Sequence, residues 1–189
     1  DAIVEFRIAE MYLRGIGVDQ SIDEAVKWLT LCSEKENPRA QFELAALYQK
    51  GEFVQQDEEK AQTLYSAALA GFLKEEENTP AASREYRIAG MFAKGNGTDQ
   101  DAEKAFRWYV QAAENGHAHA AYRAAQTCYT GTGAEQDYAE AVKWYEKAIT
   151  GGNAYAMYAL GKMYRDGIGV DGNAQIAYKY FLSAGELQH

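Results

Sequence analysis

The chain has 189 residues, of which 47% are hydrophobic and only two are proline, so it is too apolar to be disordered. Its formal net charge of -9 disfavours non-specific binding to nucleic acid or to an anionic membrane surface, which requires a basic protein. No apolar run approaches the ~20 residues that a membrane-spanning helix needs. We therefore expect a folded protein with no nucleic-acid partner and no membrane span.

Turn glycines divide the chain into repeats. They recur every 36 residues except for one interval of 44, at Gly15, Gly51, Gly95, Gly131 and Gly167. This spacing predicts five units and an eight-residue insert, with the boundaries 1–36, 37–72, insert 73–80, 81–116, 117–152 and 153–188. A unit of this size cannot bury its own apolar faces, so we expect one array in which each unit packs on its neighbours.

Each unit carries two helical patterns. In the last unit, Ala156, Leu160 and Tyr164 are four residues apart and share one helix face. A glycine turn follows, and Ala177 and Phe181 begin a second face. The pattern predicts an all-α fold of five antiparallel helix pairs. Three units begin with residues that favour the N-cap position, namely Asp1, Asn37 and Asn153.

Two positions depart from the repeat. Phe53 stands where the other units have the second turn glycine, so the turn of the second unit should differ in shape. The insert is acidic, and we expect it to be an exposed loop or one extra helical turn. Thr79 and Pro80 at its end are expected to be the N-cap and first residue of the next helix.

The repeated motif resembles a known family. The first half, A-x-x-x-L-G-x-x-Y-x-x-G-x-G-V, is present at 156–170, and the second, K-A-x-x-W-Y-x-x-A-A-x-x-G, at 104–116. Both are similar to the Sel1-like repeat, a relative of the tetratricopeptide repeat. The resemblance implies a right-handed α-solenoid superhelix that is a scaffold or adaptor for protein complexes, without chemistry or cofactor. It also implies a bacterial type of protein in the periplasm or the cytoplasm, with the periplasm favoured.

No residue pattern indicates a catalytic or metal site. Cys32 and Cys128 occupy core positions of distant units, so we expect two buried thiols and no disulfide. His117 and His119 are two residues apart at a helix start and cannot face the same way, which makes them a poor metal pair. We expect no enzyme activity; a hydrolase whose site is not visible in the sequence is the remaining enzymatic alternative.

Charge is distributed unevenly between the two helices of the units. The first fourteen positions of the five units hold ten cations and six acids, whereas the remainder holds nine cations and 22 acids. In tetratricopeptide-like stacks the first helices line the concave face, so this acidic chain should have a locally basic groove. The alternative is a merely solvated face. Cations and tyrosines along the first helices are the candidate partner-binding residues, namely Arg7, Arg39, Arg87, Arg123, Tyr122, Tyr129, Tyr155 and Lys162.

Two functions remain open at the level of sequence. The first is a general scaffold or adaptor that binds one or more proteins in its concave groove, through an acidic or polar segment of the partner. The second is a dedicated inhibitor, because some bacterial members of the resembled family look like immunity proteins that neutralise a secreted toxin. The oligomeric state is not predicted.

Overall fold

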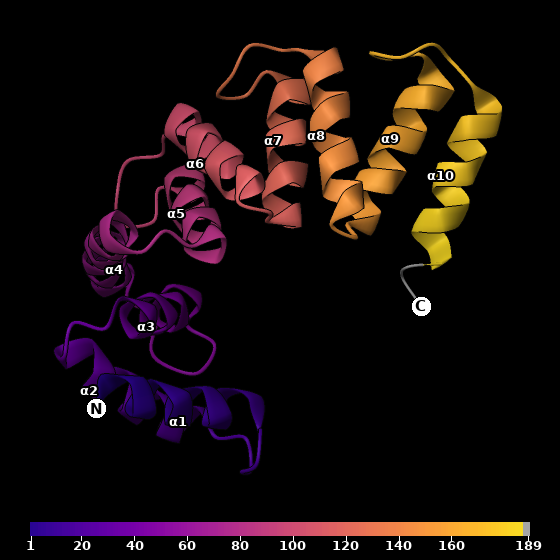
Figure 1. Ribbon diagram of the computed structural model, residues 1–189. Coiled ribbons are helices and arrows are strands. Elements are labelled where there is room, and N and C mark those ends of the chain that lie inside the picture. The colour runs from indigo at the N-terminus through magenta and orange to yellow at the C-terminus, as the bar shows by residue number, and fades with distance from the viewer. Residues whose placement is uncertain (187–189) are drawn as a thin grey trace. The chain divides into compact units, whose positions relative to one another are not determined.

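The computed structural model of the chain describes residues 1–186, and within them every regular element is a helix (Figure 1). This confirms the prediction of an all-α solenoid of five helix pairs. The ten helices of this part of the chain are α1 (Ala2–Arg14), α2 (Ile22–Glu34), α3 (Pro38–Lys50), α4 (Glu58–Asn78), α5 (Ala82–Lys94), α6 (Ala102–Glu114), α7 (Ala118–Thr130), α8 (Tyr138–Thr150), α9 (Ala154–Asp166) and α10 (Ala174–Glu186).

The helices belong to two compact units. The N-terminal unit consists of residues 1–79 with the loop 94–100, and the C-terminal unit consists of residues 80–93 and the chain from residue 101 onward. Within each unit, the second helix of a pair also packs on the first helix of the next pair, as α2 does on α3, α6 on α7 and α8 on α9. This is the neighbour packing that a repeat too small for its own core requires.

The helix ends confirm the predicted capping residues. The side chains of Asp1, Asn37 and Asn153 each accept a hydrogen bond of 3.0 Å from a backbone N–H in the first turn. Four first helices end at a glycine in the left-handed region, with φ between 66° and 73°, namely Gly15, Gly51, Gly131 and Gly167. The glycine spacing read from the sequence therefore corresponds to a physical helix stop.

In the third, fourth and fifth repeats, the second turn glycine brings the turn onto the preceding repeat. A Cβ atom at Gly133 would lie 2.3 Å from the carbonyl oxygen of Ala102, and one at Gly169 would lie 2.7 Å from the Cβ of Tyr138. Ala102 and Tyr138 are the first residues of α6 and α8. Phe53 cannot make such an approach, and its φ is not positive, so the prediction that the second turn differs is confirmed.

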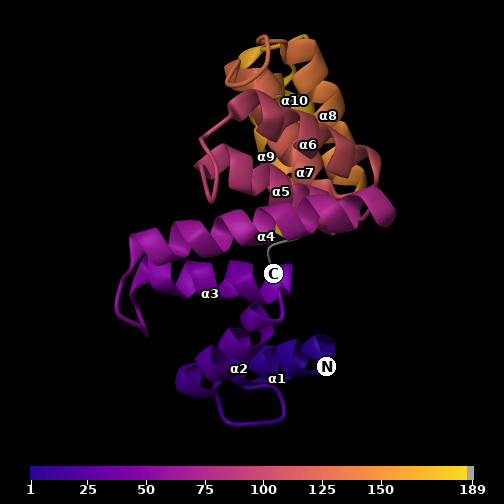
Figure 2. The ribbon, with the colours of Figure 1, turned by 90° about the vertical axis from the view of Figure 1, so that its left-hand side faces the viewer.

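The insert is helical, and the expectation of a loop or one extra turn is wrong. Helix α4 has 21 residues where the other helices have 13, so the eight added residues form just over two turns (Figure 2). Residues 73–79 contain lysine and three glutamates and no helix breaker before Pro80. Thr79 ends α4 through a hydrogen bond from its N–H to the Glu75 carbonyl, so its predicted role as the N-cap of the next helix is also wrong.

The insert also moves a turn of the N-terminal unit. A Cβ atom at Gly97 would lie 2.2 Å from the backbone nitrogen of Ser66, two turns beyond the start of α4, rather than at the helix start as for Gly133. The N–H of Gly97 donates a 2.7 Å hydrogen bond to the side chain of Gln62. The eight-residue insertion therefore displaces the contact by about its own length along the helix.

Candidate functional site

Four of the predicted binding residues lie in one pocket of the C-terminal unit. Tyr122 and Tyr129 come from α7, and Tyr155 and Lys162 come from α9. The pocket has a volume of about 360 Å³ and is completed by Gln126, Thr130, Tyr145, Tyr158, Ala159 and Met163. We call it the tyrosine pocket. Its walls are the first helices of two successive repeats, and Tyr145 of α8 contributes from the second helix between them.

Helical spacing explains why these side chains meet. Tyr155, Tyr158 and Lys162 are three and four residues apart on α9 and therefore share one face. Tyr122 and Tyr129 are seven residues apart on α7, which is about two turns. The small side chain of Ala159 lies between larger neighbours on α9 and leaves a hollow in the wall. Two local sequence patterns thus produce one concave surface.

Contacts at the centre of the pocket hold Tyr122 in place. Its ring centroid lies 5.9 Å from that of Tyr145 and 6.1 Å from that of Tyr155, at tilts of 50° and 44°. The side-chain amide of Gln126 donates a 3.0 Å hydrogen bond to the Tyr122 hydroxyl, and Arg123 donates one of 3.2 Å to the oxygen of that amide. This arrangement presents a rigid aromatic surface, which loses little conformational entropy when a partner binds.

The pocket is aromatic and carries one positive charge. Tyr155 and Tyr158 are 61% and 56% exposed, whereas Tyr145 is 4% exposed, and burial raises the pKa of Tyr145 well above its usual value. Lys162 is exposed, and no acidic side chain is among the residues that line the pocket. In a chain of net charge -9, this surface is locally positive.

The four predicted arginines are not gathered in this pocket. Arg7 and Arg39 belong to the N-terminal unit, and Arg87 and Arg123 belong to the C-terminal unit. Two of them have local partners that the sequence argument did not foresee: Arg7 pairs with Glu10 at 3.3 Å, and Arg123 bonds Gln126. A locally basic groove that includes these four arginines therefore stays a prediction.

Sequence reasoning missed part of the pocket, notably Tyr158, Gln126 and Tyr145. A usable signal for Tyr158 was its spacing of three residues from Tyr155 and four from Lys162, which places all three on one helix face. Tyr145 lies on a second helix, and no spacing within the first helices connects it to the others.

Groups capable of chemistry elsewhere in the molecule have structural environments. Cys32 and Cys128 are buried free thiols, and burial raises the pKa of each. His117 caps α7 by accepting a hydrogen bond from the N–H of Ala120, and its ring stacks on Tyr86 with centroids 4.4 Å apart. Across residues 1–186, no group of three or more His, Cys, Asp or Glu side chains is placed to hold a metal ion. Within the same residues, no helix combines the length and apolar character needed to cross a lipid bilayer.

Comparison with known families identifies the repeat. The Sel1 repeat family model matches residues 2–36, 38–71, 85–117, 118–153 and 154–189, and the chain belongs to this family. Sel1 repeats form scaffolds for protein–protein interaction and generally carry no catalytic activity, so protein partners follow from the family itself. The family matches leave out residues 72–84, where the insert lies. No curated protein matches the chain.

Solved structures with the same fold come from several bacteria. A Sel1 repeat protein from Oxalobacter formigenes is 28% identical, with a TM-score of 0.78 over 100% of this chain and 74% of that one. The protein c5321, a protective antigen of uropathogenic Escherichia coli strains with an SLR fold, is 25% identical, with a TM-score of 0.76. That match covers 98% of this chain but 38% of c5321. The immunity protein Pa5087 from Pseudomonas aeruginosa shares the fold at 15% identity and a TM-score of 0.53, over 98% and 81% of the two chains.

Proposed function

We propose that this chain is a non-enzymatic scaffold or adaptor that binds an acidic or polar segment of a partner protein in the tyrosine pocket. The observation that carries the proposal is the pocket itself, in which five tyrosines and one lysine converge without any acidic side chain. Tyrosine is among the residues that dominate interface energetics, because it supplies a large contact area and a hydroxyl at low entropic cost.

The chemistry of the pocket supports a peptide ligand. Tyrosine rings can pack against aliphatic stems or against the peptide plane, and their hydroxyls can donate to carbonyl or carboxylate oxygens. The ammonium of Lys162 can pair with an Asp or Glu of the partner. A volume of about 360 Å³ is small for a binding site, so it accommodates a few side chains rather than a folded domain. The remaining contact area would come from the surrounding first helices.

A double variant tests the assignment. We expect Tyr155→Ser with Lys162→Glu to remove an aromatic anchor and reverse the charge, and to weaken partner binding by about tenfold or more, which corresponds to ~1.4 kcal/mol. Both side chains are exposed, so the melting temperature should be close to that of the parent. The measurement is affinity capture with the parent and variant chains, followed by titration of the purified partner.

The α10 surface offers a matched control. Tyr178 is 66% exposed and its neighbour Lys179 is exposed, and neither lines the tyrosine pocket. Tyr178→Ser with Lys179→Glu makes the same chemical change on another helix and should leave the affinity unchanged. Equal losses in both double variants, or full binding by the pocket variant, would contradict the proposal.

A second candidate function is a dedicated inhibitor such as an immunity protein. The supporting observation is the shared fold with the immunity protein Pa5087, a likeness of fold alone. An inhibitor binds one enzyme and blocks its activity, whereas a scaffold holds two partners at once. Once a partner is captured, an activity assay with and without this chain, together with the stoichiometry of the complex, distinguishes the two functions.

A further inference from the structure

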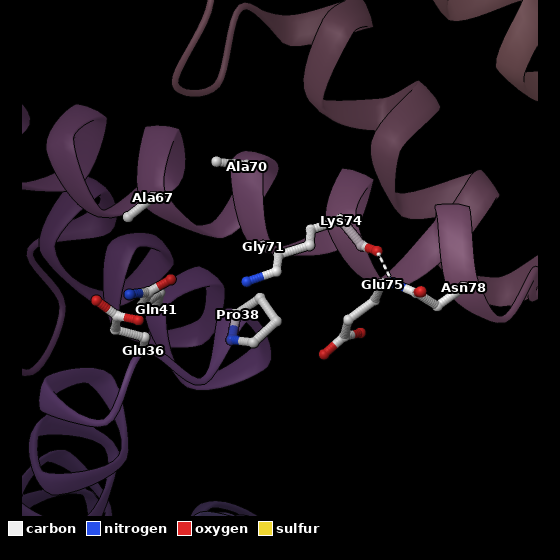
Figure 3. Close-up of a pocket in the computed structure, with 9 residues that line it drawn as sticks. All are labelled: Glu36, Pro38, Gln41, Ala67, Ala70, Gly71, Lys74, Glu75 and Asn78. Atoms are coloured by element: carbon white, nitrogen blue, oxygen red, sulfur yellow. Dashed lines mark hydrogen bonds between the residues drawn. The ribbon is translucent and has the colours of Figure 1, made fainter.

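A second cleft lies in the N-terminal unit, between the start of α3 and the last turns of α4 (Figure 3). It has a volume of about 550 Å³. Pro38 and Gly71 form an apolar floor, Glu36 and Gln41 lie at one end, and Lys74, Glu75 and Asn78 come from the helical insert. We call it the α3–α4 cleft. The side chain of Lys74 runs along the cleft over Pro38 toward Gln41 (Figure 3).

The fourth repeat contains the equivalent cleft, which makes an internal comparison possible. There, Ala118 and Gly151 take the places of Pro38 and Gly71, and the volume is about 280 Å³. Helix α8 ends at Thr150, whereas α4 continues for two more turns and adds a wall. The insert is therefore what enlarges the cleft of the second repeat.

At two equivalent positions, the larger cleft has a polar side chain where the smaller cleft has glycine or alanine. Glu36 corresponds to Gly116 and Gln41 corresponds to Ala121, while Lys74 has no counterpart because it lies in the insert. The larger cleft is thus lined by two carboxylates, of Glu36 and Glu75, with the Gln41 amide and the Lys74 ammonium, whereas the smaller one is lined by Lys147, His117 and Thr150 and by no carboxylate. Stacking of repeats does not require these carboxylates, since the fourth repeat stacks without them.

Gln41 is a polar group that lacks a protein partner. The residue is 7% exposed and lines the cleft, and within residues 1–186 its side-chain amide makes no hydrogen bond. Its amide nitrogen and oxygen are not fully buried, so they reach the solvent of the cleft and are available to a ligand as a donor and an acceptor. The position of Gln41 therefore indicates a ligand with both a donor and an acceptor.

Glu36 is held in a conformation that favours glycine. Its φ is 57°, and it is the non-glycine residue with positive φ among those that the structure describes. The equivalent residues Gly116 and Gly152 have φ of 91° and 81°. Glycine adopts this conformation without the steric cost that glutamate incurs, so a glutamate here is unfavourable for folding. Glu36 lines the end of the cleft in spite of this backbone strain, which points to a binding role for its carboxylate.

We propose that the α3–α4 cleft binds an extended peptide segment that presents a lysine or arginine side chain, as a second site separate from the tyrosine pocket. The amide of Gln41 pairs with a peptide group of the ligand, and the carboxylate of Glu36 pairs with its basic side chain. The ammonium of Lys74 donates to a ligand carbonyl. At the floor of the cleft the Pro38 ring packs on Gly71, and this surface carries no polar side chain, so the ligand main chain can lie against it.

Titration with short peptides tests the proposal. The probe is the blocked pentapeptide acetyl-Gly-Gly-Arg-Gly-Gly-amide, added to the full ¹⁵N-labelled chain and followed by NMR. We expect chemical-shift changes at the side-chain amide of Gln41 and the backbone amide of Gly71. The same peptide with Glu in place of Arg should bind about tenfold more weakly, because it loses the charge-assisted hydrogen bond to Glu36.

Variants separate binding from folding. Glu36→Gly should raise the melting temperature, because it relieves the left-handed glutamate, while it weakens binding of the arginine peptide about tenfold. Glu34→Gln removes a nearby exposed carboxylate that does not line the cleft, and it should change neither property. Gln41→Met keeps the side-chain size and should weaken both peptides.

Three results would overturn the proposal. The first is an absence of shift changes in the cleft with either peptide at millimolar concentration. The second is tighter binding of the glutamate peptide, which would make Lys74 the recognition group for an acidic segment. The third is an arginine-peptide affinity that Glu36→Gly leaves unchanged. None of these results bears on the tyrosine pocket, so failure here is distinguishable from failure of the proposed function.

Discussion

Single buried side chains in this molecule make its stability depend on pH. Tyr65 of α4 is almost fully buried and donates a 3.1 Å hydrogen bond to the side-chain oxygen of Gln49. Burial raises its pKa from the ordinary value of 10.0 to about 12. The unfolded chain therefore releases the phenolic proton near pH 10 while the folded chain retains it. The stabilisation is fully present below pH 10 and is lost as the pH rises toward 12.

Replacing Tyr65 tests this linkage. Between pH 9 and pH 11, the difference in Tyr65 pKa between the folded and unfolded chain should lower the free energy of unfolding of the parent by about 1 kcal/mol. In Tyr65→Phe this contribution to the pH dependence should be absent. The variant should be less stable by about 1 kcal/mol at pH 7, because the hydrogen bond to Gln49 is lost. Urea unfolding at the two pH values measures both effects. Tyr178→Phe, on an exposed tyrosine, should follow the parent, and identical declines in all three chains would contradict the assignment.

Within a helix pair, a buried carboxylate joins α5 to α6. Glu85 of α5 is fully buried, and its carboxylate accepts hydrogen bonds of 2.8 Å from Gln111 and 2.7 and 3.0 Å from Asn115, both on the α6 side. The first repeat has a related contact, in which Glu5 pairs with Lys35. In the second and fourth repeats the position of Lys35 and Asn115 is glycine, so these repeats close by small-residue packing instead.

Changing Glu85 should weaken this helix pair. Glu85→Gln replaces one acceptor oxygen with an amide donor that faces other donors, and we expect the free energy of unfolding to fall by about 1–2 kcal/mol. Glu85→Ala also leaves a cavity and should cost about 2–4 kcal/mol. Glu103→Gln, which changes an exposed glutamate on α6, is the matched control and should have an effect near zero. Chemical denaturation measures all three, and an unchanged midpoint for both Glu85 variants would contradict the role given to the carboxylate.

Between repeats, the second turn glycine controls how closely two elements approach. Gly17 and Gly133 both have positive φ, of 75° and 89°, so alanine is strained at either position. A Cβ atom at Gly17 would meet only the flexible end of Met11 at 3.5 Å, whereas one at Gly133 would meet backbone of α6. The comparison therefore separates the backbone cost from the packing cost.

The two alanine variants should differ in stability. We expect Gly17→Ala to lower the free energy of unfolding by about 1–2 kcal/mol, because alanine is strained in the left-handed conformation. Gly133→Ala adds an overlap with the Ala102 carbonyl and should cost about 2–5 kcal/mol in total. The measurement is the free energy of unfolding from urea melts. Equal losses would mean that the turn does not need its close approach to α6.

For the whole molecule, the distribution of charge matters more than its sum. The chain is acidic, but the first helices of the repeats carry a net positive charge, and the tyrosine pocket lies between two of them. If the predicted partner segment is acidic, these cations should accelerate association, and the rate should fall as salt screens them.

Charge reversal on first helices, compared with charge reversal on second helices, tests this expected salt-dependent association. Arg87→Glu with Arg123→Glu changes first helices of the C-terminal unit, and we expect slower association and about tenfold weaker binding. Lys147→Glu with Lys179→Glu makes the same change of net charge on α8 and α10, and it should have a much smaller effect. Stopped-flow association at 50 and 300 mM salt measures the difference. Equal slowing by both variants would show that only the total charge matters.

Local sequence determined the repeated elements of this protein. Helix periodicity, capping residues such as Asn37 and turn glycines such as Gly131 act over a few residues, so the five helix pairs and the family could be predicted without coordinates. Residue type and position on the first helices also selected Tyr122, Tyr129, Tyr155 and Lys162 as candidate binding residues, and binding by them stays a prediction.

Tertiary structure alone decided which distant side chains meet. Tyr145 completes the tyrosine pocket from α8, and Glu85 is buried because Gln111 and Asn115 cover it from the other helix of its pair. The insert was expected to be a loop or a single turn, yet helix propensity extended α4 to Asn78, and that extension built the cleft around Gln41. Such contacts depend on how elements pack across many intervening residues, and a pattern with a range of four residues carries no information about them.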